Sequence, residues 1–196
     1  MRRCHHVRRN EWILLHAAAG GVGLIALQWA VALGARVIAV VGNDEKAALV
    51  GAHGAAEVIV SGRENVAERV RAITRGRGVP VVYDGVGKDT FFASLDSLAP
   101  LGLMVSYGNA SGAVPPVAPL ELTRRGSLFL TRPTLFHYTA KRSELERGAR
   151  ELFGVVGSGR VKVRIGREYA LADAAEAHRD LEARRTTGSL LLLPGR

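Results

Sequence analysis

The chain has 196 residues, of which 47% are hydrophobic, and its formal net charge at pH 7 is +9. This length and composition suit one globular domain, or one domain and part of a second, and they exclude a disordered or low-complexity chain. Cys4 is the only cysteine. The sequence therefore excludes an intramolecular disulfide and a thiolate-rich zinc site, and it favours a reducing compartment.

The positive charge is spread along the chain, apart from an arginine-rich cluster within residues 2–9. Neither a recognition-helix pattern nor an aromatic–basic platform accompanies these residues, so we expect solvated surface charge and no nucleic-acid partner. The long apolar stretch from Trp12 to Leu33 is interrupted by a glycine turn, and no signal pattern precedes it. We therefore expect a soluble cytoplasmic protein without a membrane span.

Short apolar strands alternate with helices over the first two thirds of the chain. The predicted strands are Trp12–His16, Arg36–Val41, Glu57–Val60, Val79–Asp84, Leu103–Gly108 and Ser127–Arg132. The predicted helices are Val22–Leu33, Asp44–His53, one that begins at Asn65, and one marked by Phe91, Phe92, Leu95 and Leu98. Wholly apolar strands separated by helices indicate an α/β fold, a Rossmann-type doubly wound parallel sheet with strand order 3-2-1-4-5-6.

Local signals mark the ends of these helices. Gly34 and Gly54 are placed to end the first two helices in a left-handed conformation. Asp44 and Asn65 are placed to cap the starts of the second and third helices.

The pattern changes after residue 133. Apolar residues between Leu145 and Val156 indicate a long amphipathic helix, and a strand is expected within residues 161–171. Asp173 and Glu176 resemble a capping box at the start of a further helix. That helix should turn three residues inward: Ala174, Ala177 and Leu181.

An apolar strand within residues 189–194 closes the chain. The elements after residue 133 do not continue the strand–helix alternation. We therefore divide the chain into a nucleotide-binding domain, residues 1–135, and a C-terminal helix and strand segment, residues 136–196.

The turn between the first strand and the first helix carries a dinucleotide-binding signal. Such sites have the pattern G-x-G-x-x-G, whose glycines permit a tight turn and a close approach of the backbone to the pyrophosphate. The chain has Ala18-Ala19-Gly20-Gly21-Val22-Gly23, in which alanine replaces the first glycine. Its position between a strand and a helix, which offers free N–H groups to phosphates, predicts a dinucleotide site.

The end of the second strand indicates which dinucleotide binds. An NAD-preferring site places Asp or Glu there to bind the ribose 2′-hydroxyl. The chain has Val41-Gly42-Asn43 instead, and Lys46 follows as a positive charge for a 2′-phosphate. Asp44 and Glu45 suit the first turn of a helix. The sequence therefore predicts NADP(H) as the cofactor.

Several longer stretches resemble one family. HAAAGGVG, VVYDGVGKDTFFASLDSLAPLGLMVSYGNASG, RPTLFHYTA and EAHRDLEARRTTGSLLLLP occur in the order and spacing of its motifs. On these motifs the chain resembles the zinc-independent quinone oxidoreductases of the medium-chain dehydrogenase/reductase superfamily, which are similar to zeta-crystallin. The resemblance extends from about Arg3 to Pro194.

The resemblance implies NADPH-dependent hydride transfer to quinones or similar activated enones, without a metal. It places the pyrophosphate on the glycine turn and the 2′-phosphate on Lys46. It also places the nicotinamide end beside the loop after the fifth strand, and it lets Arg184 reach back to the cofactor. The implied cofactor-binding residues are Ala19, Gly20, Gly21, Val22, Gly23, Lys46, Gly108, Asn109, Ser111 and Arg184. No catalytic residue is nominated.

The chain departs from the family pattern in two respects. Ser61 occupies a position where the family often has a tyrosine near the adenine. Members of the family also carry a GroES-like catalytic domain before the glycine turn, so the substrate half of the site is expected to lie outside this sequence. The segment after Phe136 would pack on that domain, and apolar residues such as Phe153 are then expected to lack their cover. The edge strand Ser127–Arg132 resembles the strand through which family members form homodimers.

Two other functions remain open at this point. The chain could be an NADPH-binding module without turnover. A methyltransferase or a short-chain reductase is a weaker alternative, because a reductase of that class needs Tyr-x-x-x-Lys, whereas Ser111 follows Tyr107 and Arg142 follows Tyr138 at that spacing. A methyltransferase needs an acid at the end of the second strand, which has none.

Overall fold

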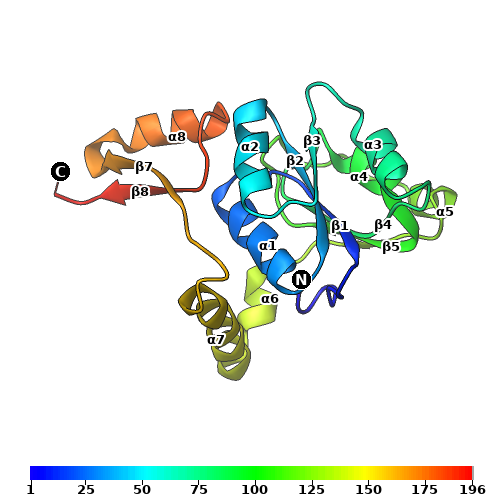
Figure 1. The fold of residues 1–196 in the computed structure, drawn as a ribbon, viewed down its shortest axis with the longest axis horizontal. Coiled ribbons are helices and arrows are strands. Elements are labelled where there is room, and N and C mark those ends of the chain that lie inside the picture. The colour runs from blue at the N-terminus through cyan, green and yellow to red at the C-terminus, as the bar shows by residue number, and fades with distance from the viewer. Residues whose placement is uncertain (196) are drawn as a thin grey trace.

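Six strands form the central sheet of the protein, which the computed structural model describes over residues 1–195 (Figure 1). The strands are β1 (Trp12–Leu15), β2 (Arg36–Val41), β3 (Glu57–Val60), β4 (Val79–Asp84), β5 (Leu98–Ser106) and β6 (Phe129–Thr131). They run parallel in the order β3-β2-β1-β4-β5-β6. The predicted fold class and strand order are confirmed.

Helices cover both faces of this sheet, because successive strand residues point to opposite faces and both sets are apolar. The helices are α1 (Gly21–Ala32), α2 (Asp44–Ala52), α3 (Val66–Ile73), α4 (Phe91–Asp96) and α5 (Leu120–Arg124). In β1, Ile13 and Leu15 pack into the core beneath α1 and α2, whereas Leu14 packs into the core beneath α3 and α4. All three side chains are fully buried.

The glycine signals at the helix ends are confirmed, and one of the two predicted caps is wrong. Gly34 and Gly54 have φ of +87° and +94°, the left-handed conformation that ends α1 and α2. Asn65 caps α3 by accepting a hydrogen bond from the Glu68 N–H. Asn43, and not Asp44, caps α2: its extended backbone lets its side chain accept from the Lys46 N–H at 2.9 Å.

The boundary between α4 and β5 also differs from the prediction. Leu98 was expected on the helix, but α4 ends at Asp96 and Leu98 begins β5, where it pairs with Val79. A buried leucine fits either element, so periodicity alone did not separate them. The sixth strand starts later than expected because Ser127 has a φ of +57°, which a strand does not allow.

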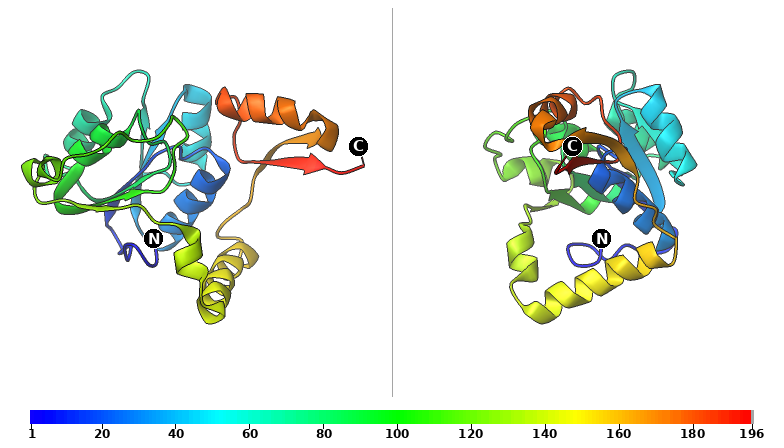
Figure 2. Two further views of the ribbon diagram at one scale, coloured as in Figure 1. Left: turned by 180° about the vertical axis from the view of Figure 1, so that it is seen from behind. Right: turned by 90° about the vertical axis from the view of Figure 1, so that its left-hand side faces the viewer.

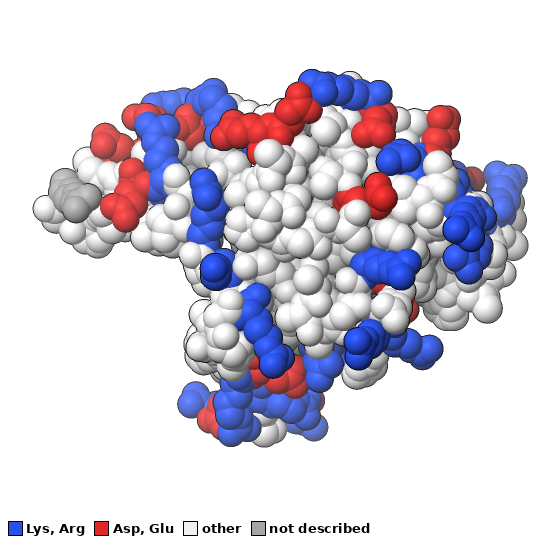
Figure 3. Space-filling view, viewed as in Figure 1, with Lys and Arg blue, Asp and Glu red and all other residues white. Residues whose placement is uncertain are grey.

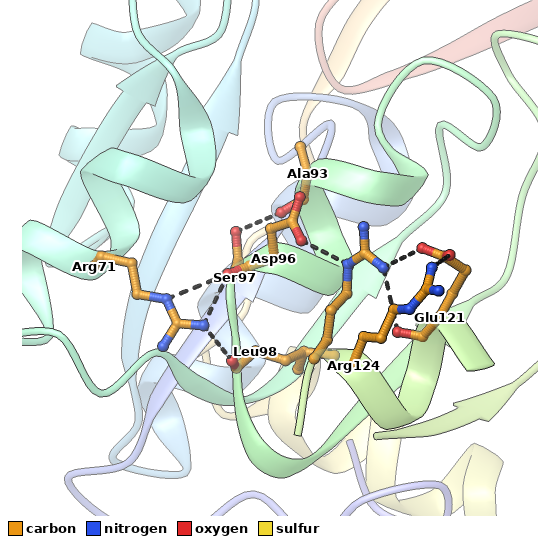
Figure 4. A network of polar contacts seen from close by, with 8 residues as sticks. Arg71, Ala93, Asp96, Ser97, Leu98, Glu121 and Arg124 are labelled. Atoms are coloured by element: carbon orange, nitrogen blue, oxygen red, sulfur yellow. Dashed lines mark hydrogen bonds and ion pairs between the residues drawn. The ribbon is translucent and has the colours of Figure 1, made fainter. Parts of the chain in front are cut away.

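Arginine side chains fasten the elements on the α3 and α4 face (Figure 4). Arg71 of α3 donates to the backbone carbonyls of Asp96 and Leu98 at 2.9 and 2.8 Å. Arg125 pairs with Asp96 at 2.6 Å and also with Glu121 of α5. These bonds join the turn between α4 and β5 to helices on either side of it.

The remaining elements extend away from the central sheet (Figures 1 and 2). They are α6 (Leu135–Thr139), α7 (Arg142–Gly157), β7 (Ile165–Ala170), a 3₁₀ turn (Leu171–Asp173), α8 (Ala174–Glu182) and β8 (Ser189–Leu193). β7 and β8 pair in parallel as a separate two-stranded sheet. The chain therefore leaves the Rossmann pattern after residue 133, as predicted.

Asp180 holds this C-terminal sheet to α8. Its carboxylate accepts hydrogen bonds from Arg167 and Tyr169 of β7, at 2.6 and 2.7 Å, and from Arg185. The Arg185 guanidinium, followed by the Tyr169 hydroxyl, lowers the pKa of Asp180 below its ordinary value. Two predictions for α8 are wrong. Asp173 occupies the cap position of α8, as predicted, but its side chain makes no capping bond, and Leu181 is not turned inward, since it is 55% exposed.

The arginines before β1 tie the N-terminal segment to α6 and α7. Arg2 pairs with Glu151 and Arg3 with Glu144, both at 3.0 Å. The guanidinium of Arg3 also lies over the Tyr138 ring, 5.0 Å from its centre. The N-terminal segment thus lies between the sheet and α7 (Figure 2, right).

Lys and Arg occur in several separate groups on the face shown in Figure 3, with Asp and Glu between them. None of the helices within residues 1–195 is both long enough and apolar enough to cross a membrane.

Candidate functional site

The turn from β1 to α1 presents unused backbone N–H groups. Ala17 adopts a left-handed φ of +51°, and Gly20 occupies the cap position of α1 without a side-chain cap. Leu24 donates the first bond of the helix, to the Gly20 carbonyl at 2.8 Å. The N–H groups of Val22 and Gly23 precede that bond, and no acid lies in the first turn. This helix end can therefore receive an anion.

Two of the glycines in this turn leave no room for a side chain. A Cβ on Gly23 would lie 2.2 Å from the Ala17 carbonyl oxygen, and one on Gly21 would lie 2.8 Å from the Ser189 Oγ. Ala19 is buried in the core, whereas Val22 is 67% exposed at the tip of the helix. The turn is thus tightly packed, and Val22 is the residue of residues 19–23 that it exposes.

The loops after β4 and β5 are joined to each other at the same edge of the sheet. The Ser111 N–H and hydroxyl both donate to the Val86 carbonyl, at 2.8 and 2.9 Å. A Cβ on Gly108 would lie 2.3 Å from the Gly85 carbonyl oxygen, so only glycine permits this approach. Asn109 between them is exposed. Gly108 and Ser111 therefore shape the loop, and Asn109 is the residue that it presents.

A buried polar network, which was not predicted, holds these loops. Asp84 is fully buried and accepts from the N–H groups of Val86 and Gly87, at 2.7 and 3.1 Å. It also accepts from the Ser94 hydroxyl at 2.7 Å, and that hydroxyl lies 3.0 Å from Nε2 of His16. Burial lowers the pKa of His16, against a smaller opposing effect of Asp84. The network links the end of β1 to the end of β4.

A sequence signal for part of this network was available. An acid at the end of a buried strand, followed by Gly85-Val86-Gly87, is placed to accept from the N–H groups of the turn. The partners Ser94 and His16 carried no such signal, because they come from a helix and from another strand.

Lys46 and Arg184 lie together at the end of β2. The Lys46 ammonium donates to the Arg184 backbone carbonyl, and the Arg184 guanidinium lies 3.4 Å from the Asp89 carboxylate. Burial is the main cause that lowers the pKa of Lys46. Ser61 donates to the Val41 carbonyl at 3.2 Å. Lys46 and Arg184, which are 138 positions apart in the sequence, thus lie in contact as two neighbouring basic residues.

The C-terminal sheet contacts the glycine turn directly. Gly188 donates its N–H to the Ala19 carbonyl at 2.9 Å, and it forms a parallel bridge with Gly20. Gln28 of α1 exchanges two hydrogen bonds with the Lys162 backbone, at 2.9 and 3.0 Å. The segment from Arg184 to Gly188 therefore contacts both Lys46 and the glycine turn.

Two grooves lie near the ends of β5 and β6. The first is an apolar groove of about 280 Å³, lined by Phe91, Ser106, Asn109, Ala113, Val114, Val117, Leu130 and Arg132. The second is polar, about 260 Å³, and is lined by Arg3, Thr131, Arg132, Pro133, Thr134, His137 and Tyr138. Both adjoin the loop that presents Asn109 or the segment that follows β6.

Two tyrosines near the site are held as neutral phenols. The Tyr83 hydroxyl is buried without a hydrogen-bond partner in the part of the chain that the structure describes, and burial raises its pKa. Burial also raises the pKa of Tyr107, to about 12. Neither phenol therefore ionises near neutral pH.

Comparison with known proteins agrees with this geometry. Residues 21–153 match the model of a family described as zinc-binding dehydrogenase. The chain belongs to this family. It is 53% identical to a quinone oxidoreductase of Pseudomonas aeruginosa over 194 residues, and 44% identical to a 2-haloacrylate reductase of a Burkholderia species over 195 residues. The predicted resemblance to quinone oxidoreductases is confirmed.

A solved structure gives the same result. The crystal structure of the Escherichia coli quinone oxidoreductase complexed with NADPH matches with a TM-score of 0.95 at 48% identity, over 98% of this chain. The match covers 60% of that protein, and the two relatives above are covered over 60% and 59% of their lengths. The chain thus spans about three fifths of the proteins it matches.

Proposed function

We propose that the chain is the NADP(H)-binding part of an oxidoreductase that transfers a hydride from NADPH to quinones or similar activated enones. The observation that carries the proposal is the uncapped N-terminus of α1, which offers the N–H groups of Val22 and Gly23 without an acid in the first turn. The names of the relatives and the NADPH in the E. coli structure support the same cofactor and reaction class.

Each predicted residue has a role in this proposal. Residues 19–23 cradle the pyrophosphate with the backbone of a turn whose tight packing requires the absence of a Cβ at Gly21 and Gly23. Lys46 and Arg184 bind the 2′-phosphate by charge. Gly108 and Ser111 fix the loop after β5, so that Asn109 lies beside the nicotinamide end. Bound NADPH supplies the hydride, and the protein orients it and excludes water.

We propose that the reaction uses no zinc and no catalytic acid from this chain. The chain has a single cysteine, and within residues 1–195 no three His, Cys, Asp or Glu side chains come together as possible metal ligands. Asp84 and His16, the buried polar groups at the site, are linked through the Ser94 hydroxyl and are buried in the core.

We also propose that residues 1–135 are the nucleotide-binding domain and that residues 136–196 pack on a further domain. Exposed apolar side chains of the second segment support this division: Phe136 and Phe153 are 82% and 70% exposed. A homodimer is proposed through the edge strand within Ser127–Arg132, where Phe129 and Leu130 of β6 are 60% and 40% exposed.

Two measurements test the function. Calorimetric titration of the full chain with NADPH measures binding, and loss of NADPH absorbance in the presence of a small quinone measures turnover. Binding with turnover supports the oxidoreductase. Binding without turnover supports the alternative, an NADPH-binding module. A chain that does not bind NADPH overturns both functions. A Lys46→Gln variant should bind NADPH more weakly than the wild-type chain, while its affinity for NADH is unchanged.

A further inference from the structure

Arg63 and Asp44 form a bidentate ion pair next to the end of β2. Two guanidinium nitrogens of Arg63 donate to the two carboxylate oxygens of Asp44, at 2.8 and 2.6 Å. We propose that Arg63 sets the cofactor preference by neutralising Asp44, an acid that would otherwise favour NAD(H) over NADP(H). The inference rests on the dinucleotide function proposed above and names the residue that gives the site its specificity.

Asp44 is the first acid after β2 in the chain. In doubly wound sheets an acid after the second strand binds the ribose 2′-hydroxyl of NAD, and its charge opposes a 2′-phosphate. β2 ends at Val41, and Asp44 is the first residue of α2. Because Asn43 caps the helix, the Asp44 side chain is not used for capping, and it is 64% exposed.

The fold brings Arg63 to this acid. β3 lies parallel to β2 with Val60 opposite Val41, and Ser61 donates its N–H to the Val41 carbonyl at 2.9 Å. The turn after β3 is closed by a bond of 2.9 Å from the Arg63 N–H to the Val60 carbonyl. The backbone of both strands therefore fixes the distance between the turn that carries Arg63 and the first turn of α2.

The other charged residues near Asp44 determine how strongly its neutralisation affects phosphate binding. Asp89 is paired with Arg184, and Glu64 is paired with Arg69, each at 3.4 Å. Glu45 acts on Lys46 through its charge. While Arg63 covers Asp44, a phosphate with roughly two negative charges meets the cation of Lys46. If Arg63 were lost, the same phosphate would meet an unpaired carboxylate two residues away in the sequence.

Calorimetric titration of the full chain with NADP⁺ and with NAD⁺, at pH 7.5 and one fixed ionic strength, tests the inference. The chains compared are wild type, Arg63→Gln, Asp44→Asn, the double variant and Arg142→Gln. The last is a matched control, because it removes the same charge from an exposed ion pair with Glu146 on α7. Circular dichroism melts check that each variant is folded.

Arg63→Gln should lower the ratio of the NAD⁺ to the NADP⁺ dissociation constant at least tenfold, which is about 1.4 kcal/mol. The double variant should return that ratio to within about threefold of wild type, because the acid that needed neutralising is gone. Asp44→Asn alone should keep or increase the preference for NADP⁺, and Arg142→Gln should leave it unchanged.

Three results overturn the inference alone. The first is an unchanged ratio of dissociation constants in Arg63→Gln. The second is an equal fall of that ratio in Arg63→Gln and in the double variant, which would mean that Arg63 contacts the phosphate directly. The third is an equal fall of the ratio in Arg142→Gln. A wild-type chain that binds neither dinucleotide overturns the proposed function and this inference together.

Discussion

Gly23 is the position of the glycine turn with the least room for a side chain. We predict that Gly23→Ala lowers the free energy of unfolding by about 1–3 kcal/mol, because the new methyl group would overlap the Ala17 carbonyl oxygen. Gly51→Ala is the matched control: it lies inside α2 with no atom near its Cβ, and should raise stability by roughly 0.5–1 kcal/mol. Urea denaturation measures both. Equal effects of the two substitutions would contradict the steric argument.

His16 makes the stability of the protein depend on pH. Burial lowers its pKa in the folded state below the ordinary value of about 6.5. Above that pH His16 is neutral in both the folded and the unfolded chain, so its ionisation does not change the free energy of unfolding. As the pH falls below about 6.5, the unfolded chain takes up a proton that the folded chain does not, and stability is lost by up to about 1.4 kcal/mol per pH unit.

A His16→Gln variant isolates this effect. We predict that the wild-type chain loses more stability than His16→Gln between pH 6.5 and pH 5, because glutamine can still reach the Ser94 hydroxyl but does not titrate. Urea midpoints at a series of pH values give the comparison. Parallel pH profiles would show that His16 is not the group responsible.

At the scale of residues, the sequence predicted what depends on near neighbours. The glycine turn between β1 and α1 and the Asn65 cap could be identified because their signals lie within a few positions. The pairing of Asp44 with Arg63 and the contact of His16 with Ser94 could not, since they join residues 19 and 78 positions apart. Such pairs depend on which strands are neighbours, and that is decided by the whole sheet.

At the scale of elements, Gly188 is the contact between the C-terminal sheet and the glycine turn. Its φ is +64°, and a Cβ there would lie 2.5 Å from the Arg164 carbonyl oxygen. We predict that Gly188→Ala loosens β7 and β8 and raises their amide hydrogen exchange, measured by mass spectrometry. Gly159→Ala is the control, because Gly159 has a similar φ of +74° but nothing near its Cβ.

The two variants separate backbone strain from a lost contact. Both substitutions carry the cost of a left-handed alanine, about 1–2 kcal/mol. Only Gly188→Ala should also speed the exchange of backbone amide hydrogens in the glycine turn, where the Ala19 carbonyl accepts the Gly188 N–H. Similar exchange around the glycine turn in both variants would mean that the bond between Gly188 and Ala19 contributes little.

Element type was easier to predict from the sequence than element ends. The strands β2, β3 and β4 have the predicted bounds because apolar runs end there at glycine or polar residues. Leu98 and Leu181 were misplaced for the opposite reason: an apolar side chain has no preference for one face until its neighbours are known. Leu98 became a buried strand residue, and Leu181 an exposed helix residue.

At the scale of the whole molecule, two of the uncovered apolar surfaces within the described residues bear on association. One lies along α6 and α7, where Phe136 and Phe153 are exposed on elements that contact the N-terminal segment. The other is the edge of the central sheet at β6, where Phe129 and Leu130 are exposed next to unpaired backbone. The first is amphipathic helix surface and the second is a sheet edge, so they favour different partners.

A single charge at the sheet edge distinguishes the proposed dimer from general association. We predict that Phe129→Lys shifts the chain from dimer to monomer in sedimentation velocity, because a lysine on an edge strand opposes pairing with a second edge. Phe136→Lys adds the same charge at a more exposed phenylalanine outside the sheet, and it should leave the dimer intact. If Phe136→Lys alone produced monomers, association would run through the helical surface, and β6 would be an edge that this chain leaves unpaired.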